Sequence, residues 1–507
     1  MHSAGCARAP CRRYTGVRRY PAVRAEKLSA AIVRTALALV AMLWGVCVGQ
    51  AFAEDPSGSA PESRRNDAAA RLAADAYKEN LARYGKDPDY LVRPGLLASR
   101  RDKQVKIWAR ATGLPEHDPI EFFLIPQDSG KDYEAIAVAF AKPSDVHAAL
   151  EFIGMKPGRC VDYSAGRCWP KGERVIMNVE WNEPSARPGG AAVSRRVRIE
   201  ELVFDHNANR PLPAAGLVFT GSCMVRPEGS DRDVYAADVM DPKSIASDFN
   251  DPTTVMDVPR QAPKSTVYGT LRPNPAYKLA VGQPLLITAE PEYKDGRLRV
   301  RDLTLRISMP GPGSGPRDAR YVLVDAASGA AAAKGETLVH LLAAFAEMTE
   351  AGQDPFLTVI PDGAMTLGAV HAVYRLLMDM DNERGIRIDG PPPGHLYYRA
   401  FFPKNEWRDR SRRLGRPWEF HVVEKDHKAA GTLILPADEI DDNQGRGDLK
   451  FTVGTPEEMA EVLVKNSNRF SQLVYIFAPR SMSYGGLMRL IAPSMKTHGP
   501  MYVFLPE

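Results

Sequence analysis

The chain has 507 residues, of which 44% are hydrophobic and 25% charged, with 41 Pro, 40 Gly and a formal net charge of +4. These fractions are those of ordinary globular proteins, so they exclude a largely disordered, collagenous or disulfide-dense chain. At roughly 150 residues per domain, the length predicts two to four domains.

The first 53 residues have the order of a secretory signal. Eight basic residues and the single acid Glu26 precede an apolar run at residues 36–48, and the small residues around Ala53 suit a cleavage site. We therefore predict a signal peptide over residues 1–53 and a periplasmic or secreted protein; an uncleaved membrane anchor is the alternative. The remaining chain has 58 Lys and Arg against 61 Asp and Glu, so the basic excess belongs to the leader and nucleic acid is not an expected partner.

The next part of the chain is predicted as a linker with a spacer helix, residues 54–100, followed by a β-rich domain, residues 101–308. Ala, Leu and Tyr recur at helical spacing over residues 66–84. In the β-rich domain short alternating runs are broken by turn residues, and one helix is expected from Pro143 to Gly154. The run 297–307 is predicted as the last strand of this domain.

A Pro/Gly linker at residues 309–319 then precedes a β-α-β-α-β pattern that occurs twice. The first module covers residues 320–390 and the second residues 418–507, with a basic linker at residues 391–417 between them. The two copies align at a fixed offset of 117 residues, which pairs Met365 with Met482, Thr366 with Ser483, and Gly368 with Gly485.

The candidate functional residues of the first domain come from a predicted strand and the start of the next helix: Lys131, Glu134, Asp145 and His147. A helix N-terminus favours anions through its free N–H groups. One alternative explains Asp145 as a helix-capping residue. Another is a metal- or acid/base-dependent enzyme that uses Glu134 and His147.

Three observations concern other chemistry. The chain contains no HExxH, Walker A or strand-linked GxGxxG sequence, so no catalytic residue, metal or cofactor is predicted. Cys160 and Cys168 are a candidate disulfide, with two unpaired thiols as the alternative. The basic linker offers candidate anion-binding residues, although a solvated linker is the favoured explanation: Arg408, Arg410, Arg412, Arg413 and Arg416.

The stretches IEFFLIPQDSGKDYEAIAVAF, at residues 120–140, and GLVFTGSCMV, at residues 216–225, resemble the YdjY-like domain of secreted proteins of planctomycete-type bacteria. The family pattern has His where this chain has Tyr133, which weakens a proposed His-Glu site. The resemblance implies an extracytoplasmic domain without a settled biochemical role.

The two modules resemble the periplasmic domain of the ExbD/TolR family. The shared features are the loops PDGAMTLG and PRSMSYGG, each followed by an amphipathic helix and a final strand. The transmembrane helix of that family, with its proton-coupling Asp, precedes neither module. The resemblance therefore implies a soluble fold that tends to pair, and an intrachain pseudo-dimer in which residues 386–389 and 501–505 pair or form exposed edges.

Together these features predict an α+β protein, exported and non-enzymatic, with a binding or scaffolding role toward an envelope protein or a cell-wall component. Its alternatives are an extracytoplasmic enzyme and an accessory subunit of an envelope transport or motor complex. Contact with the membrane is expected only if the leader is uncleaved, and a dimer or an intrachain pseudo-dimer is expected.

Overall fold

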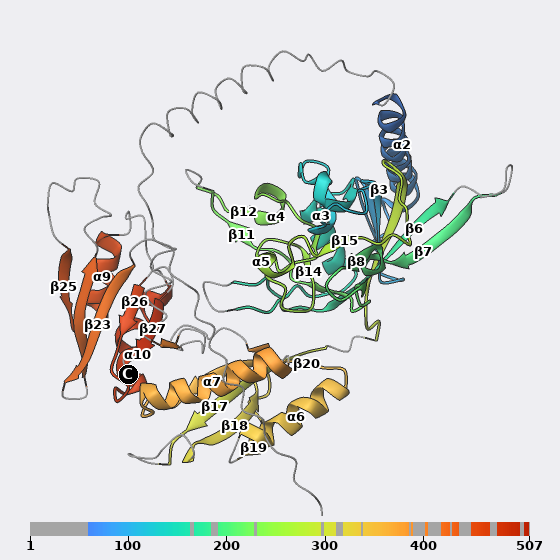
Figure 1. The fold of residues 1–507 in the computed structure, drawn as a ribbon. Coiled ribbons are helices and arrows are strands. Elements are labelled where there is room, and N and C mark those ends of the chain that lie inside the picture. The colour runs from blue at the N-terminus through green and yellow to red at the C-terminus, as the bar shows by residue number, and fades with distance from the viewer. Residues whose placement is uncertain are drawn as a thin grey trace, which may run out of the picture. The chain divides into compact units, whose positions relative to one another are not determined.

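The computed structural model is a mixed α+β, strand-rich protein (Figure 1). The predicted leader and the five linker arginines lie outside the residues that it describes. Across the described segments no helix is both long and apolar enough to cross a membrane. The described residues are 59–162, 167–183, 191–227, 231–295, 299–310, 318–335, 338–384, 387–388, 401–403, 417–425, 428–435, 448–466, 474–496 and 501–505.

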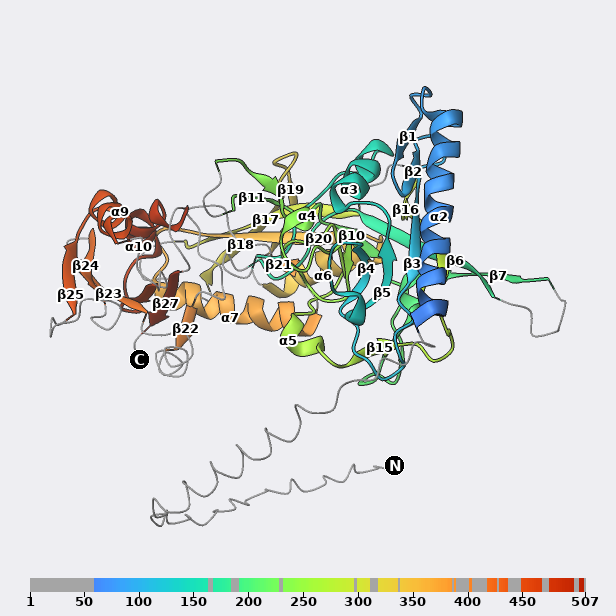
Figure 2. The ribbon, with the colours of Figure 1, turned by 90° about the horizontal axis from the view of Figure 1, so that it is seen from above.

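The predicted N-terminal helix is present as α2 (Ser59–Tyr84). Its last residue stacks on Tyr90 with ring centroids 4.2 Å apart, at the start of a hairpin of β1 (Tyr90–Arg93) and β2 (Leu96–Ser99). Figure 2 shows α2 and this hairpin on the same side of the β-rich part. The segment predicted as a linker with a spacer helix thus also supplies two strands that extend the main sheet.

The main sheet closes into an eight-stranded barrel, because its last strand pairs back onto β3 through Ala109 and Ala139. The strands β4 and β5 are buried at every position, and their side chains divide between the main core and a smaller cluster around Phe249. In order around the barrel, the strands are β3 (Gln104–Ala111), β16 (Pro284–Pro291), β6 (Arg174–Glu183), β10 (Leu217–Phe219), β14 (Met256–Asp257), β13 (Ala246–Ser247), β4 (Phe122–Pro126) and β5 (Ala135–Ala139).

The helix α3 (Pro143–Phe152) packs against the barrel as its sequence predicts. Val146, Ala149 and Leu150 are buried at helical spacing, and Gly154 follows with φ of +96°. The other elements of this part are η1 (Asp132–Glu134), β7 (Val193–Arg198), η2 (Ile199–Leu202), β8 (Val203–Asp205), β9 (Arg210–Pro211), β11 (Met224–Val225), β12 (Val234–Tyr235), α4 (Ala236–Val239), α5 (Lys264–Val267) and β15 (Leu271–Pro273).

The first α/β sheet contains a strand that the sequence places in the preceding domain. β17 (Val300–Ser308) pairs antiparallel with β18 and parallel with β20, so the expected position of residues 297–307 in the β-rich domain is wrong. Its alternate residues Leu303, Leu305 and Ile307 are buried in the core of this sheet, which explains its position. The sheet runs β19 (Ala331–Gly335), β18 (Arg320–Asp325), β17, β20 (Asp354–Pro361) and β21 (Arg387–Ile388), with helices α6 (Leu338–Glu350) and α7 (Leu367–Arg384).

The second α/β sheet has the same order over its shared strands. Its β23–β24 pair is antiparallel and its β23–β26 pair parallel, as are β17–β18 and β17–β20. β21 is an edge strand, as predicted for residues 386–389, but β27 is not, because β22 pairs with it. The sheet runs β22 (Phe401–Pro403), β27 (Met501–Leu505), β26 (Val474–Phe477), β23 (Trp418–Lys425), β24 (Lys428–Leu435) and β25 (Leu449–Val453), with α9 (Pro456–Lys465), α10 (Tyr484–Ile491) and η7 (Ser494–Lys496).

Backbone hydrogen bonds join the two sheets through the loops before α7 and α10, where Thr366 and Ser483 form a bridge. A Cβ on Gly485, in the first turn of α10, would lie 3.0 Å from Cα of Gly363, so glycine favours the close approach there. Residues of both sheets form one hydrophobic core. Four bonds come in two pairs related by the 117-residue offset: Leu367 N to Met482 O (2.8 Å) with Tyr484 N to Met365 O (2.7 Å), and Gly368 N to Arg480 O (2.9 Å) with Gly485 N to Gly363 O (2.9 Å).

Candidate functional site

The four candidate residues of the first domain do not form one site. Lys131 Nζ lies 3.8 Å from Glu134 Oε1, whereas Asp145 Oδ1 lies 3.7 Å from Arg93 Nε. His147 contacts a different set of residues, Gly221, Tyr235 and Glu151, and among the described residues no hydrogen bond or ion pair joins it to Glu134. The structure therefore brings together Lys131 and Glu134 only.

Glu134 is part of a buried acidic group. It is 7% exposed, and burial together with the neighbouring Glu121 raises the pKa of its carboxyl. Glu121 is itself buried, and its carboxylate pairs with Lys264 at 2.6 Å. Tyr133, where the resemblance to the YdjY-like domain leads us to expect His, is exposed and accepts a hydrogen bond from Lys131 at 3.3 Å. These contacts explain the position of Glu134 in the fold, and His147 is not among its partners.

His147 is held in one orientation by two neighbours. Its Nδ1 lies 2.9 Å from the carbonyl of Gly221 and 2.8 Å from the hydroxyl of Tyr235, which also donates to that carbonyl at 3.0 Å. Because a carbonyl can only accept, the proton of the neutral ring is assigned to Nδ1. Nε2 faces Glu151 at 3.4 Å, and the ring edge packs on Phe219. The imidazole therefore tethers α3 to the 220–223 loop.

A surface pocket of about 430 Å³ surrounds this histidine, and it includes the exposed Cys223. Burial, and to a lesser extent the negative charge of Asp251, raises the pKa of the Cys223 thiol. Burial also raises the pKa of Tyr235. A thiol with a raised pKa is protonated at neutral pH and is a poor nucleophile. The pocket is lined by Ser144, His147, Pro157, Gly158, Thr220, Gly221, Ser222, Cys223, Met224 and Tyr235.

The predicted disulfide between Cys160 and Cys168 is not formed. Cys160 is a buried thiol that donates to the carbonyl of Thr254 at 3.3 Å. The antiparallel bridge between Asp162 and Arg167 places Cys168 opposite Val161, one residue out of register with Cys160. Since neighbouring side chains point to opposite faces, the two sulfur atoms do not meet.

The ligand sets that proteins use for metal ions are clusters of His, Cys, Asp and Glu side chains. No three His, Cys, Asp or Glu side chains of the described segments are placed to hold a metal ion.

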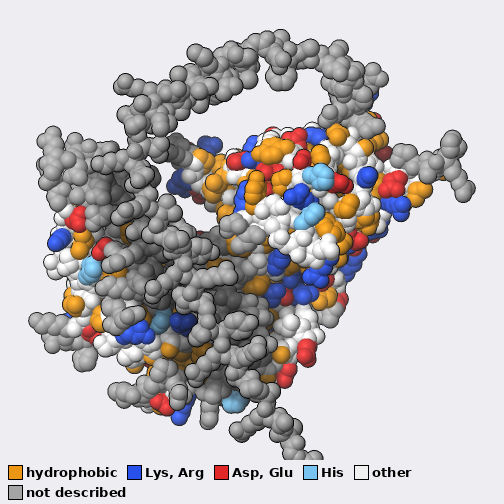
Figure 3. All heavy atoms as spheres, viewed as in Figure 1, with side chains coloured by type: hydrophobic (Ala, Val, Ile, Leu, Met, Phe, Trp, Pro, Cys, Tyr) orange, Lys and Arg blue, Asp and Glu red, His pale blue; other side chains and the backbone are white. Residues whose placement is uncertain are grey.

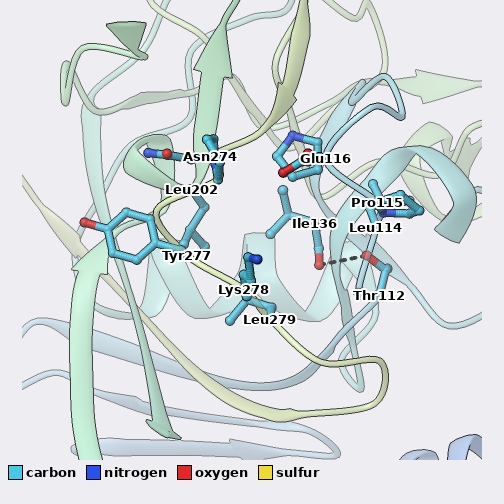
Figure 4. A pocket seen from close by; sticks show the side chains of 13 residues that line it. Thr112, Leu114, Pro115, Glu116, Ile136, Leu202, Asn274, Tyr277, Lys278 and Leu279 are labelled. Atoms are coloured by element: carbon cyan, nitrogen blue, oxygen red, sulfur yellow. Dashed lines mark hydrogen bonds between the residues drawn. The ribbon is translucent and has the colours of Figure 1, made fainter.

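A second pocket, which the sequence does not reveal, lies between two loops at the ends of the neighbouring strands β3 and β16; we call it the loop pocket (Figure 4). Its volume is about 270 Å³. A Cβ on Gly113, whose φ is +70°, would lie 2.5 Å from the backbone nitrogen of Val281, so glycine lets the two loops meet. The loop pocket is lined by Thr112, Gly113, Leu114, Pro115, Glu116, Ile136, Leu202, Pro273, Asn274, Pro275, Tyr277, Lys278 and Leu279.

The inner polar groups of the loop pocket are already paired. Asn274 donates to Glu201 O at 2.7 Å and accepts from Ala276 N at 3.0 Å, and the Thr112 hydroxyl donates to Ala135 O at 2.6 Å. These bonds fix both loops, so the cavity is preformed. In the sequence this pocket is marked only by two loops that contain Gly or Pro. The two loops lie close together because β3 pairs with β16.

Comparison with known families identifies one part of the chain. Residues 98–255 match the family model of the YdjY domain, and no curated protein matches the chain. The match includes most strands of the barrel but ends before β14 and β16, and it covers 158 of the 507 residues. The likeness of the two α/β modules to ExbD/TolR stays a prediction, whereas the barrel segment 98–255 is similar to the YdjY domain.

Proposed function

We propose that the protein is an exported, non-enzymatic envelope protein that binds a partner along the edges of its two α/β sheets. The observation that supports this proposal is the pair of edge strands β19 and β25, which occupy equivalent positions in the two sheets. Ala332 in β19 and Thr452 in β25 are exposed, and within the described residues no strand covers either edge. An uncovered edge offers backbone N–H and C=O groups to an added strand.

The pairing of the loops before α7 and α10 gives this proposal its geometry. We interpret the two modules as ExbD/TolR-like copies of one unit, joined as an intrachain pseudo-dimer. The 117-residue relation between their hydrogen bonds and their shared core support that interpretation. A joined pair holds the two edges in a fixed relation, which suits a scaffold for an envelope protein.

An enzymatic role has weaker support. Glu134 and His147 lie in different clusters, and the Cys223 thiol has a raised pKa. We therefore assign no catalytic step to these residues.

Site-specific photo-cross-linking tests the proposal. We would place p-benzoylphenylalanine at Ala332 or Thr452 in the native host, with Glu457, an exposed residue of α9, as the matched control. We expect discrete adducts with an envelope protein from one or both edge positions and none from Glu457. Equal cross-linking from all three positions, or none from the edges, would contradict edge binding.

The proposed export has its own test. N-terminal sequencing of the protein from the extracytoplasmic fraction is expected to begin at Glu54. An intact leader in the membrane fraction would instead support an anchored protein.

A further inference from the structure

We propose that the loop pocket binds a small zwitterion with one apolar side chain, the chemical class of the apolar α-amino acids. This inference is independent of the edge-strand proposal, because the barrel and its loops alone build the pocket. Either proposal can fail without the other.

The floor of the loop pocket accepts an apolar group. Ile136 and Leu202 are 5% and 2% exposed, and Leu114 and Leu279 pack against the same core. Thr112 and Asn274 already bond to the protein, and the apolar side chains that form the rest of the floor favour an apolar inserted part of the ligand. A volume of about 270 Å³ lies at the lower end for ligand pockets, which favours a small molecule.

The rim of the loop pocket carries both signs of charge on separate loops. Glu116 follows β3, whereas Lys278 precedes β16, and both are exposed. In Figure 4, Ile136 lies between them in the view shown. Among the described residues no hydrogen bond or ion pair engages the Lys278 ammonium or the Tyr277 hydroxyl, while Glu116 contacts the neighbouring His117 at 3.6 Å.

These groups match the two ends of a zwitterion. The ammonium of Lys278 complements a carboxylate. The Glu116 carboxylate complements an α-ammonium group. A ligand with a single charge would contact one side of the rim only, whereas an apolar amino acid contacts both sides and places its side chain on the floor.

The test is calorimetric titration of the intact protein with L-leucine and L-phenylalanine, beside N-acetyl-L-leucine and L-leucinamide. We expect saturable binding of the free amino acids. Each blocked derivative loses one charged contact, so its affinity should fall about tenfold or more.

Two variants assign the contacts. Glu116→Gln should remove the discrimination against N-acetyl-L-leucine but keep that against L-leucinamide, and Lys278→Met should do the reverse. Both side chains are exposed, so the fold should persist, which circular dichroism checks. Lys106→Met, at an exposed position of β3, is the matched control and should change none of the affinities.

Three results would overturn the inference. They are no saturable binding of leucine or phenylalanine, equal affinities for free and blocked derivatives, and unchanged discrimination in both variants. Binding of dileucine without binding of leucine would likewise reject the amino acid and assign a peptide ligand.

Discussion

Replacing Asp354 with Asn should destabilise the first α/β sheet strongly, because this buried carboxylate is shared by three arginines. Its side chain is 8% exposed, and its oxygens lie 3.2 Å from Arg174 Nη2, 3.0 Å from Arg299 Nε and 3.1 Å from Arg387 Nη1. Burial lowers the pKa of Arg174 to about 10 despite the neighbouring Asp354, which reflects how poorly its charge is solvated. Glu292 is the neighbouring acid, and its carboxylate pairs with Arg299 at 2.9 Å.

The size of this destabilisation follows from the arginine charges that lose their shared carboxylate. Removing one partner of a buried ion pair costs about 3–5 kcal/mol, and Asn keeps one acceptor oxygen for a single arginine. We therefore expect the free energy of unfolding, measured by urea denaturation at neutral pH, to fall by about 3 kcal/mol or more. Asp302→Asn is the control: this half-exposed side chain pairs with Lys171, so its loss should cost about 1 kcal/mol or less. A loss below about 1 kcal/mol for Asp354→Asn would refute the assignment of these contacts.

Three further predictions concern the acids, the loops and the thiols. Burial raises the pKa of Asp257, so between this raised pKa and about pH 4 the native state holds a proton that the unfolded state has released. The free energy of unfolding should therefore rise as the pH falls through that window. Asp257→Asn should flatten this rise in urea titrations. Gly485→Ala should lower the melting temperature, at a cost of about 1–3 kcal/mol from overpacking on Gly363, although alanine favours helices; an unchanged melting temperature would contradict the close approach. A thiol reagent should label exposed Cys223 in the native protein and buried Cys160 only after unfolding, as peptide mass spectrometry can check.

Local signals predict local structure in this chain, and β17 shows where they fail. The helix α3 follows from Pro143, the spacing of Val146 and Leu150, and Gly154, all within one short segment. The Pro/Gly run after Ser308 suggests a domain boundary, yet it connects two paired strands of one sheet. The 117-residue offset contained the missing information, because it places residues 302–306 opposite residues 419–423, which lie in β23.

The sites depend on contacts between distant segments, which explains why the sequence reveals little of them. The loop pocket joins Glu116 and Lys278 through the pairing of β3 with β16. His147 meets Gly221 and Tyr235 through the packing of α3 on a later loop. Neither of these contacts leaves a signal in the sequence. The YdjY resemblance can be found in the sequence, because it depends on the order of several stretches along the chain.

The described face of the barrel carries charges of both signs. Figure 3 shows acidic, basic and hydrophobic side chains interspersed over the described face of the barrel.

The most direct test of binding at the sheet edges is amide hydrogen exchange of the protein with the partner that the cross-linking identifies. Strand addition predicts that amides of β19 (Ala331–Gly335) or β25 (Leu449–Val453) gain protection in the complex, while those of α9 (Pro456–Lys465) stay unchanged. Protection confined to the barrel or to the helices, with both edge strands exchanging as in the free protein, would contradict the account.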